Sequence, residues 1–563
     1  MTQSNAVPMM FRAQVAGRCQ LQRIDPKRKG TEKQDVQIWT EQWIDKAEEH
    51  PPQFSALVQT RSYQITWRFI TNGGQDDGII RPVIGARGVP FYPGSSMKGL
   101  FRRACHHLEQ TSEIAAGTCD RLCGNSYDLT PGILRFHGGY PTSGDWTEHL
   151  LDIVHPQQSW QVKSPNTKAK QGSAYAQISL YKPELQFGIS SIEPLSDETW
   201  QTIWKIWETA LSMGLGCRVS SGYGQVQNHA GEVLHRFRIK GQGQAPKQLN
   251  GTYEFRPNLF RAALRGHALR IFGGLTHERN VELLVDQLFG GIQRNQSYWG
   301  LLSMGFRDRK LTLNQEKGTY EVTGDLTWHL TQPLTNEQHT VLKELVLRLM
   351  QFAMVFGGFG KSWRRADHRL FMDDYDKQLI GCHWQWDGQR SPIAHNPVRK
   401  LEDIPSFLAK VQASAIAWMT LQGMTPDSDH FADWREAWHP ANVQVWGRVA
   451  GTKQPLLHGR DNCIAIRWLH QPYAIEVKGV REVPRSIKGS TVSGHLNCIG
   501  RLWHRMYPVV LKKKDPKDES KWLPQNTPLF LELLTLFPDE TLEFTQFQSF
   551  LDSAQKDFVK LWG

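Results

Sequence analysis

Two stretches of the sequence combine a proline-led helix start with closely spaced basic side chains. The first runs from Phe91 to Arg103 and the second from Phe255 to Arg265. The start of a helix has free N–H groups and a partial positive charge, so basic residues beside it favour phosphate binding. An ordinary capped helix with a solvated basic face fits the same residues. The expected anion-binding residues are Ser95, Ser96, Lys98, Arg102, Arg103, Arg261 and Arg265, with Ser95 or Ser96 as the helix cap.

A glycine-rich stretch follows a predicted helix at two places, residues 213–224 and residues 357–365. Glycine lets the backbone approach a ligand closely, and successive free N–H groups can form an anion-binding concavity. Basic and aromatic side chains are interleaved in both stretches, which favours phosphates together with stacked bases. Neither stretch is a P-loop, and a plain turn after a helix is the competing interpretation. The residues expected to contact nucleic acid here are Arg218, Tyr223, Lys361, Arg364 and Arg365.

Three cysteines and two histidines lie close together in the sequence after the first basic stretch. Structural zinc sites take four thiolate or imidazole ligands, so this group is a candidate zinc site. The usual CxxC pair is absent, and buried free cysteines on a helix also explain the pattern. The candidate ligands are Cys105, His106, Cys119 and Cys123.

The elements that must position these residues recur along the chain. The first basic stretch returns after 164 residues, the helix end at Leu122 after 166 and the stretch at Pro194 after 139. The order is kept while the spacing changes, as in duplicated domains with different insertions. Each copy reads as strand, helix, strand, strand, helix and glycine-rich loop, with Ser196 and Thr335 as helix N-caps. This order predicts an α+β fold of tandem ferredoxin-like, RRM-type domains.

Three regions follow from this repeat. We expect a first domain over residues 1–230, a second over 231–375, and a divergent C-terminal α+β region over 376–563. Residues 484–490 are similar to the first basic stretch, so the last region is predicted to contain a divergent or partial third copy. The lysine-rich segment 511–518 is expected to be a solvated loop.

The composition narrows the class of protein. The chain has 563 residues, 39% of them hydrophobic, with 21 Trp and a formal net charge of +11. These values exclude a disordered chain, a collagen-like repeat and a coiled coil. No run of 18 apolar residues and no signal-peptide pattern is present, so we expect a cytoplasmic protein without a membrane span. The positive charge favours a polyanionic partner.

The stretch Gly88–Gly99 resembles the PGSS-x-KG motif of the RAMP superfamily of CRISPR-associated proteins, and the loop at 214–224 resembles that superfamily's glycine-rich loop. Two copies in one chain resemble the fused backbone subunits of type III-D effector complexes. The resemblance implies a subunit that binds guide RNA, presents it to complementary target RNA and contacts other subunits of the complex. It also implies a protruding thumb, for which the basic stretch with Lys163 and Lys168 is the candidate.

The resemblance further implies cleavage of the target RNA by an aspartate before the PGSS helix, with Mg²⁺ or Mn²⁺. Asp76 and Asp77 occupy that neighbourhood, and Asp25 is a second candidate. The corresponding stretch of the second copy, residues 240–248, has no acidic residue, so we expect that copy to be inactive. Two alternatives remain open. One is a purely architectural RNA-binding subunit, and the other is a guide-RNA-processing nuclease that would use His137 and His155.

Overall fold

The structure is a computed structural model. It describes residues 33–563 apart from 49, 72, 77–78, 86, 126, 155–159, 164–174, 230, 294–295, 371–380, 389–390, 428, 452–462, 471–474, 478–479, 483–485, 496–497 and 554–557. Within these ranges the fold is α+β, with several antiparallel sheets lying beside helices. Among the described helices, none combines the length and the apolar character needed to cross a bilayer.

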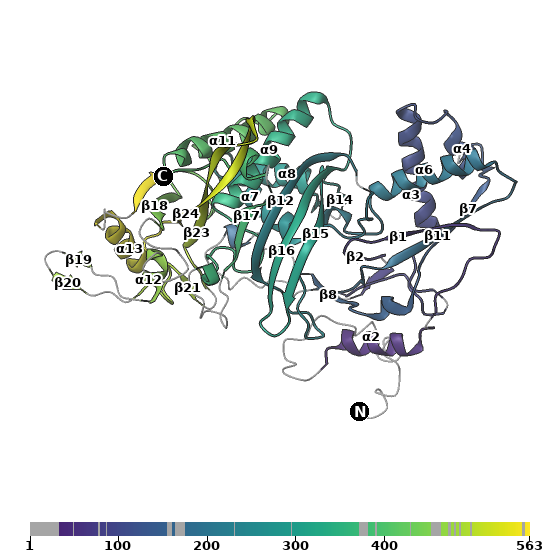
Figure 1. Cartoon of the computed structure of the whole chain (residues 1–563), viewed down its shortest axis with the longest axis horizontal. Coiled ribbons are helices and arrows are strands. Elements are labelled where there is room, and N and C mark those ends of the chain that lie inside the picture. Colours follow the sequence, from purple (N-terminus) through teal and green to yellow (C-terminus); the bar gives the residue numbers. More distant parts are fainter. Residues whose placement is uncertain are drawn as a thin grey trace.

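Three sheets follow one another along the molecule in chain order (Figure 1). We call the sheets with their helices the first unit (residues 33–229), the second unit (231–388) and the third unit (444–563). Residues 391–443 form a connecting segment.

The first unit contains a three-stranded antiparallel sheet in the order β1-β11-β7. Its helices α3 and α6 contact each other, and α3 also contacts β7. Residue Val226, after α6, bridges Ile65 at the other edge of β1. The elements are α2 (Asp35–Lys46), β1 (Gln59–Gln64), β2 (Arg68–Phe69), β3 (Gly74–Asp76), β4 (Ile79–Arg81), α3 (Gly94–Gln110), α4 (Thr118–Cys123), β5 (Gly124–Asn125), β6 (Thr130–Pro131), β7 (Leu134–Pro141), β8 (Leu151–Val154), α5 (Trp160–Lys163), β9 (Tyr175–Ile178), β10 (Leu180–Tyr181), β11 (Glu184–Ser191) and α6 (Asp197–Ser212).

The second unit contains a four-stranded antiparallel sheet in the order β15-β16-β12-β17. Its elements are β12 (Val233–Gln244), α7 (Leu259–Gly273), α8 (Glu278–Phe289), β13 (Gly291–Gln293), β14 (Gln296–Tyr298), β15 (Leu302–Asn314), β16 (Thr319–Leu330), α9 (Asn336–Val355) and β17 (His383–Trp386). The first residues of the stretch 240–248, expected to be a loop, therefore belong to strand β12.

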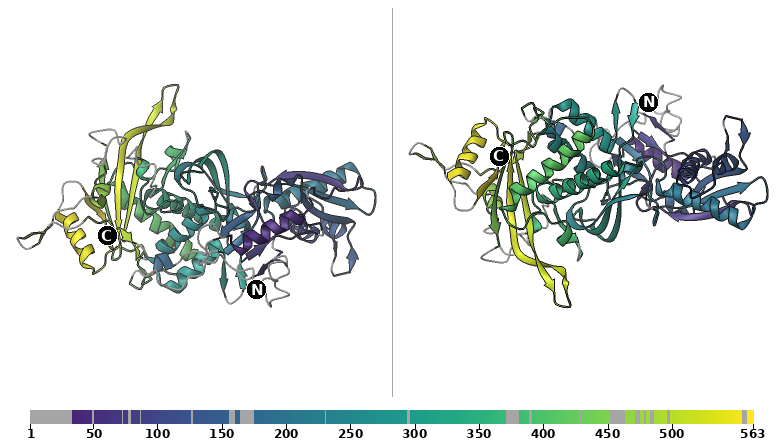
Figure 2. Two further views of the ribbon diagram at one scale, coloured as in Figure 1. Left: turned by 90° about the horizontal axis from the view of Figure 1, so that it is seen from below. Right: turned by 90° about the horizontal axis from the view of Figure 1, so that it is seen from above.

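The third unit has the same strand order, β23-β24-β18-β25. Only a divergent or partial copy was expected here. The segment 511–518 is the turn end of the long β23–β24 hairpin rather than a loop, and Figure 2 shows this hairpin projecting from the molecule. The elements are α10 (Ser391–Ala394) and α11 (Asp403–Leu421) of the connecting segment, then β18 (Gln444–Ala450), α12 (Ile464–His470), β19 (Ile475–Val477), β20 (Val480–Glu482), β21 (Gly494–His495), β22 (Cys498–Ile499), β23 (Leu502–Asp515), β24 (Asp518–Leu536), α13 (Leu542–Ser553) and β25 (Val559–Trp562).

Each unit also carries a short hairpin just before the second strand of its sheet: β5–β6, β13–β14 and β21–β22. A glycine with positive φ precedes or opens each hairpin, and a second glycine closes it. In the first unit these are Gly124 and Gly132, and a Cβ added to Gly132 would lie 2.5 Å from the Gly124 nitrogen. The same clash occurs between Gly300 and Gly290, at 2.2 Å. No larger residue fits such a backbone approach.

The helix starts follow the sequence signals in part. Ser196 and Thr335 are N-caps, as predicted, and each accepts a hydrogen bond from a backbone N–H in the first turn of its helix. The prediction that Ser95 or Ser96 caps α3 is wrong, because the N-cap residue is Pro93 and both serines lie in the first turn. Gly94 is required there, since an added Cβ would lie 2.0 Å from the Phe136 carbonyl oxygen.

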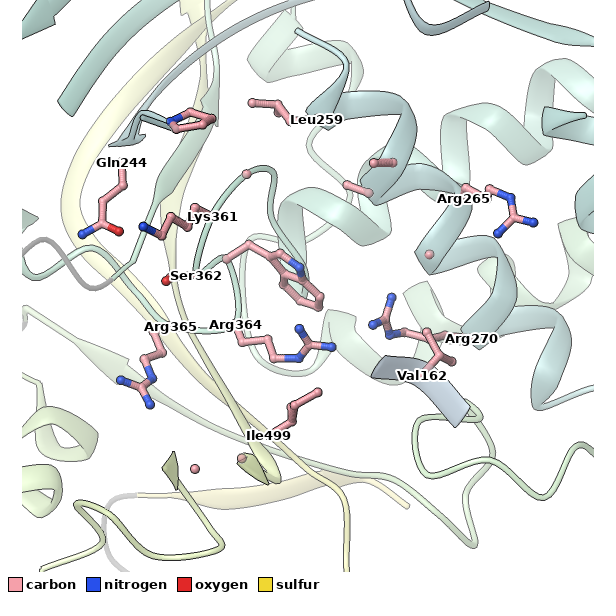
Figure 3. A pocket seen from close by; sticks show the side chains of 18 of the residues that line it. Val162, Gln244, Leu259, Arg265, Arg270, Lys361, Ser362, Arg364, Arg365 and Ile499 are labelled. Carbon is pink, nitrogen blue, oxygen red and sulfur yellow. The ribbon is translucent and has the colours of Figure 1, made fainter. Parts of the chain in front are cut away.

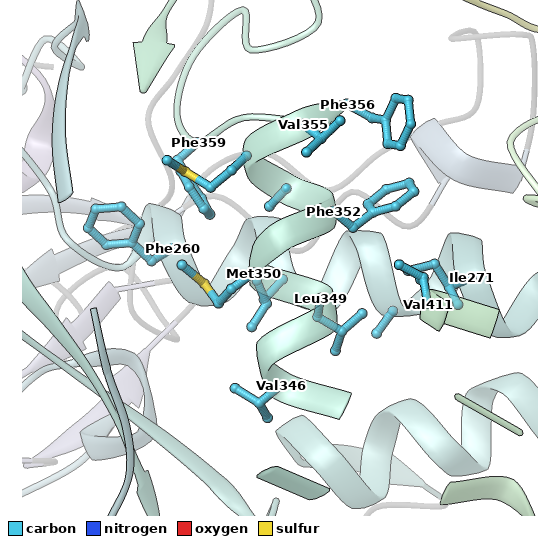
Figure 4. Close-up of a cluster of buried hydrophobic side chains, with 14 of the residues drawn as sticks. Phe260, Ile271, Val346, Leu349, Met350, Phe352, Val355, Phe356, Phe359 and Val411 are labelled. Atoms are coloured by element: carbon cyan, nitrogen blue, oxygen red, sulfur yellow. The ribbon is translucent and has the colours of Figure 1, made fainter. Parts of the chain in front are cut away.

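One hydrophobic core runs through the second unit, the connecting segment and part of the third unit. Helix α9 lies at its centre, and Figure 4 shows its side chains facing α7 and Val411 of α11. Aromatic contacts extend this core, since Phe352 packs edge-on against Trp438 with ring centroids 4.6 Å apart. Shared apolar burial of this kind favours a fixed arrangement of the second and third units.

Candidate nucleic-acid interface

A cavity of about 860 Å³ lies between the second and third units (Figure 3). Helix α7, from its start to Arg270, and the glycine-rich loop after α9 form its walls on the side of the second unit. Hairpin β21–β22 closes it from the third unit, and β8 and α5 reach it from the first unit. The helix start and the glycine-rich loop, which are 90 or more residues apart in the sequence, therefore face one ligand-sized space.

The wall of this cavity is strongly basic. None of the described residues that line it is acidic, whereas six of them carry a positive charge. Four of them, Arg265, Lys361, Arg364 and Arg365, are residues that the sequence suggested for RNA contact. The other two were not proposed, although Arg256 lies within the second basic stretch and Arg270 follows it. The six are Arg256, Arg265, Arg270, Lys361, Arg364 and Arg365.

Two of the six cations keep most of their hydrogen-bonding capacity for a ligand. Lys361 is exposed in the glycine-rich loop, directly after Gly360 and next to the exposed Ser362. Arg365 is half-buried, and its guanidinium donates to the Ser493 carbonyl oxygen at 2.9 Å. A guanidinium has five N–H donors, so one such bond leaves donors for a phosphate.

The other arginines of the cavity are held by carboxylates outside its wall. Arg265 pairs with Asp286 at 3.2 Å, and Arg256 pairs with the buried Asp152. Arg270 and Arg364 share Glu436, which Arg435 also contacts. Three guanidinium groups therefore surround one carboxylate, which leaves an excess of positive charge beside the cavity.

Glu436 is fully buried. Burial alone would raise the pKa of this carboxyl group, but the charges of Arg364, Arg270 and Arg435 outweigh it and lower the pKa to about 2. In turn, burial lowers the pKa of Arg270 to about 10, against the opposing effect of Glu436. Glu436 stays ionised at neutral pH and fixes the arginines in place.

Trp363 shapes the floor of the cavity without offering a free ring face. The guanidinium of Arg364 lies 4.7 Å from its ring centroid and that of Arg270 lies 5.2 Å away. Trp503 of the third unit packs against the same ring at 4.8 Å. The tryptophan therefore orients two cations rather than stacking on a base in this arrangement.

The corresponding residues of the first unit are more exposed. Ser95 and Ser96 are exposed in the first turn of α3, and no acidic residue lies in that turn. Lys98 and Arg102 are half-buried, and the guanidinium of Arg103 lies 5.4 Å from the ring centroid of Trp299 in the second unit. Arg218, in the first glycine-rich loop, adopts a positive φ of 59°. The helix and the loop together place cations at the junction of the first and second units.

Three residues expected to contact RNA are engaged elsewhere. Tyr223 is 1% exposed and its hydroxyl donates to Asp152 at 2.7 Å. The guanidinium of Arg261 donates to the Phe289 carbonyl oxygen, and burial lowers the pKa of Arg261 to about 10. The Lys163 ammonium pairs with Glu282 at 2.6 Å and lies 4.7 Å from the ring of Trp434. These contacts join units to one another or complete the core. Lys168 lies outside the described residues.

The candidate zinc ligands lie together. Cys105, Cys119 and Cys123 are buried, and the imidazole Nε2 of His106 is 3.5 Å from the Cys119 sulfur. Hydrogen bonds from Cys105 and Cys123 lower the pKa of Cys119 to about 3. The other imidazole nitrogen of His106 is 3.2 Å from a Glu109 carboxylate oxygen, the arrangement that orients metal-bound histidines. These donor types are those of a structural Zn²⁺ site, but among the described residues only Cys463, His504 and Glu532 have ligand atoms that all lie within 4.8 Å of one another.

The second unit fills the equivalent space differently. The offsets of the repeat place Leu269, Val285 and Phe289 where the first unit has its three cysteines, and all three are buried. Apolar side chains therefore fill that space in the second unit. The thiols of the first unit are thus a local addition to a shared core position.

A second cluster was not foreseen from the sequence. Cys463, His504 and Glu532 of the third unit are buried within hydrogen-bonding range of one another. Burial would raise the pKa of Glu532, but hydrogen bonding to His504 and the charge of Arg448 lower it to about 2. The carboxylate also accepts a bond from the Ala465 N–H at 3.1 Å, so existing partners satisfy it without a metal. These residues are far apart in the sequence and gave no local signal.

Of the three proposed catalytic aspartates, only Asp76 lies among the described residues. Asp25 and Asp77 lie outside the described residues. Asp76 ends strand β3, although its side chain is not among those described. Strand β3 is an edge of the small sheet β3-β4-β9-β8. Three strand spacings, roughly 14 Å, separate it from the β8 edge that reaches the cavity.

The histidines of the processing-nuclease alternative are not brought together by any described contact. His137 is exposed on β7, and its Nε2 is 2.8 Å from the Ser190 hydroxyl of β11. His155 lies outside the described residues. No observation favours an acid–base pair formed by these two side chains.

Comparison with known proteins adds a weak structural similarity. No family model and no curated protein sequence matches the chain. A solved structure described as "Type IV-B CRISPR Complex" aligns with 30% of this chain and 87% of that chain, at 16% sequence identity and a TM-score of 0.20. A likeness at this TM-score carries no argument about fold or function.

Proposed function

We propose that the chain is a RAMP-superfamily backbone subunit of a cytoplasmic type III CRISPR ribonucleoprotein, and that its basic cavity holds phosphates of the guide RNA. The observation that carries the proposal is the wall of that cavity, whose described residues include six cationic side chains and no acidic one. Such a wall attracts the negatively charged phosphates of a nucleic acid, and no acidic group among its described residues would repel them. Backbone phosphates give sequence-independent affinity, as a guide of variable sequence requires.

The repeated architecture supports the same proposal. In all three units the strand that opens the unit lies between the third strand and an edge segment, which is the order of a split βαβ, ferredoxin-like domain. We therefore propose tandem ferredoxin-like domains with boundaries near 1–230, 231–375 and 376–563. Repeated helix starts and glycine-rich loops would present phosphate sites at intervals along an RNA strand.

The proposal is tested by isolating the tagged chain from its native cells under conditions that preserve complexes. We expect co-purified RNA of defined length, protected from added nuclease, together with other protein subunits. Sequencing of that RNA should show one constant segment joined to variable ones. Recovery of the chain without RNA of defined length contradicts the proposal.

We also propose that the first unit cleaves target RNA paired to the guide, with Asp76, Asp77 or Asp25 holding Mg²⁺ or Mn²⁺. The double variant Asp76→Ala/Asp77→Ala should slow target cleavage at one or more positions by at least about 100-fold, because a carboxylate that positions a metal or takes up a proton contributes on that scale. Guide binding should remain. Cleavage mapping on labelled target RNA, with and without EDTA, measures the effect.

A matched control is Asp515→Ala/Asp518→Ala, an acidic pair at the turn end of the third unit's hairpin. It removes the same charge and should leave every cut unchanged. Retention of all cuts in the Asp76/Asp77 variant would mean that these residues form a solvated turn without a catalytic role. Absence of any metal-dependent cutting in the wild type would leave the architectural subunit as the function.

The cysteine cluster is proposed to bind one structural Zn²⁺ through Cys105, His106, Cys119 and Cys123. The purified chain should then contain about one zinc per molecule by elemental analysis, and Cys119→Ser should lose it, because the central thiolate is removed. The Cys498→Ser variant changes a half-buried cysteine of the third unit and should keep the metal. Wild-type protein that stays zinc-free after incubation with Zn²⁺ under reducing conditions contradicts the assignment.

A further inference from the structure

A buried carboxylate interrupts an apolar row on the sheet of the third unit. Glu532, Leu534 and Leu536 share one face of β24, since alternate residues of a strand lie on the same side. The two leucines are buried with side chains of α12 and α13. Glu532 beside them is 0% exposed. A carboxylate in such a place must be paired with a cation or coordinate a metal.

Two further side chains converge on one oxygen of this carboxylate. The Sγ atom of Cys463, which directly precedes α12, lies 3.1 Å from Glu532 Oε1, and the Nε2 atom of His504 on β23 lies 3.0 Å from the same oxygen. The sulfur and the nitrogen are themselves 3.5 Å apart. A sulfur, a nitrogen and an oxygen from three separate segments therefore form a closed triangle in the interior of the third unit.

The size of this triangle matches three ligands of one tetrahedral zinc ion. Zn²⁺ binds sulfur at about 2.3 Å and nitrogen or oxygen at about 2.0–2.2 Å, which places neighbouring ligand atoms about 3.4–3.6 Å apart. No edge of the triangle has to lengthen by more than about 0.5 Å to reach these values. Thiolate and imidazole favour Zn²⁺ over Mg²⁺ or Ca²⁺, which take oxygen ligands.

Hydrogen bonding alone supplies this oxygen with more donors than it has lone pairs. The backbone N–H of Ala465 also donates to Glu532 Oε1 at 3.1 Å, whereas the guanidinium of Arg448 holds Oε2 at 2.5 Å. A carboxylate oxygen has two lone pairs, so it cannot accept well from an N–H, a thiol and an imidazole at once. Zn²⁺ would replace the last two donors: the thiol proton passes to solvent, and the neutral imidazole binds through its Nε2 lone pair. The Ala465 and Arg448 bonds would remain and orient the carboxylate.

The second unit carries apolar side chains at the equivalent places of its sheet. Counted from the paired ends of the strands, Met304 on β15 occupies the place of His504, and Leu326 on β16 occupies that of Glu532. Phe237, opposite Leu326, lies where β18 has the arginine that pairs with Glu532. All three residues of the second unit are buried. The polar group is thus particular to the third unit and is not a shared feature of the repeated sheet.

We propose that Cys463, His504 and Glu532 bind one Zn²⁺ ion, with a water molecule as the fourth ligand. The site is separate from the cysteine cluster of the first unit, and it does not depend on the proposed RNA-binding function. Its ligands must first give up hydrogen bonds, and one of them is a carboxylate. The site therefore binds more weakly than a set of four thiolate and imidazole ligands, and it fills when Zn²⁺ is supplied to the purified chain.

The proposed site lies directly behind the wall of the basic cavity. The backbone N–H of His504 donates to the Arg364 carbonyl oxygen at 2.9 Å, and the neighbouring Trp503 packs against Trp363 of the same glycine-rich loop. A metal held by His504 would join the start of β23 to β24 and to the start of α12. Its role is therefore structural, because it would fix the strand on which this loop rests.

The metal content of two cysteine variants tests the site. In equilibrium dialysis of the full chain against Zn²⁺ under reducing conditions, Cys463→Ser should hold one ion per chain fewer than the wild type. The control Cys498→Ser changes another cysteine of the third unit and should hold as many ions as the wild type. The comparison is a difference, so it is independent of how many ions bind elsewhere. Equal zinc content in the wild type and Cys463→Ser overturns the inference.

A second measurement remains decisive if Cys463→Ser fails to fold. X-ray absorption of the Zn²⁺-loaded variant Cys119→Ser, in which the three proposed ligands are unchanged, should show one sulfur and three nitrogen or oxygen neighbours per zinc. A zinc held by the cysteines of the first unit would have at least two sulfur neighbours. Two or more sulfurs per zinc, none, or no bound zinc overturns the inference, whereas the RNA content of the chain bears only on the proposed function.

Discussion

Replacing Lys361 and Arg365 together by alanine should weaken the binding of single-stranded RNA by about 100-fold at constant salt. Both side chains line the cavity and neither is neutralised by a carboxylate among its described contacts. A charge-assisted hydrogen bond contributes about 1.5–3 kcal/mol, so the loss of two contacts of the weaker kind corresponds to roughly two powers of ten. Fluorescence anisotropy with a labelled RNA measures the change.

The salt dependence gives an independent readout of the same contacts. Each phosphate that a cation neutralises on a single strand contributes about 0.7 to the slope of log affinity against log salt concentration. The double variant should therefore lower the magnitude of that slope by about 1.4. The loss should be similar for RNAs of unrelated sequence, because phosphate contacts carry no base identity.

The matched control removes two lysines from another surface. Lys343 on α9 and Lys410 on α11 are exposed and do not line the cavity, so Lys343→Ala/Lys410→Ala changes the net charge equally. It should leave affinity within about twofold and preserve the slope. Equal losses in the two variants would mean that RNA responds to net charge alone. An unchanged affinity in the cavity variant would remove the cavity from the binding site.

Some of this site could be predicted because its parts are local in sequence. A proline-led helix start and a glycine-rich loop are short patterns, and in the second unit both line the same cavity. Arg265, Lys361, Arg364 and Arg365 therefore line one cavity, as their residue types suggested. Ser196 and Thr335 were recognised as caps for the same reason, since a cap acts within one turn.

Contacts between units could not be predicted in this way. Tyr223 and Lys163 have the composition of RNA-binding residues, but their partners Asp152 and Glu282 come from other elements 71 and 119 residues away. No periodicity relates such positions. The third sheet was underestimated because it lacks a glycine-rich loop and because β23 and β24 exceed ordinary strand length, at 14 and 19 residues.

Glu436 is the residue whose loss should cost most stability. The variant Glu436→Gln leaves Arg270, Arg364 and Arg435 without the buried carboxylate that they share. Removing one partner of a buried ion pair typically costs about 3–5 kcal/mol, because the remaining charges are left desolvated and repel one another. The unfolding midpoint should fall by about 10 °C for a unit of this size. Urea and thermal denaturation followed by tryptophan fluorescence measure the loss.

The same carboxylate predicts an acid dependence with a defined sign. The pKa of Glu436 is lowered from an ordinary 4.5 to about 2 in the folded chain. Its contribution is therefore complete above about pH 4.5 and is lost as the pH falls toward 2. The stability difference between the wild type and Glu436→Gln should accordingly shrink over that interval, and it should be constant from pH 5 to pH 7.

The control and the binding assay separate two explanations of this stability loss. Glu344→Gln removes a half-exposed carboxylate paired with Arg348 on α9, and it should cost no more than about 1 kcal/mol. If the three arginines also attract RNA, Glu436→Gln should bind RNA at least as tightly as the wild type while folded, because the cavity gains positive potential. A variant as stable as the wild type would show that the arginines do not depend on Glu436. A folded variant with weaker RNA binding would show that their exact placement outweighs their charge.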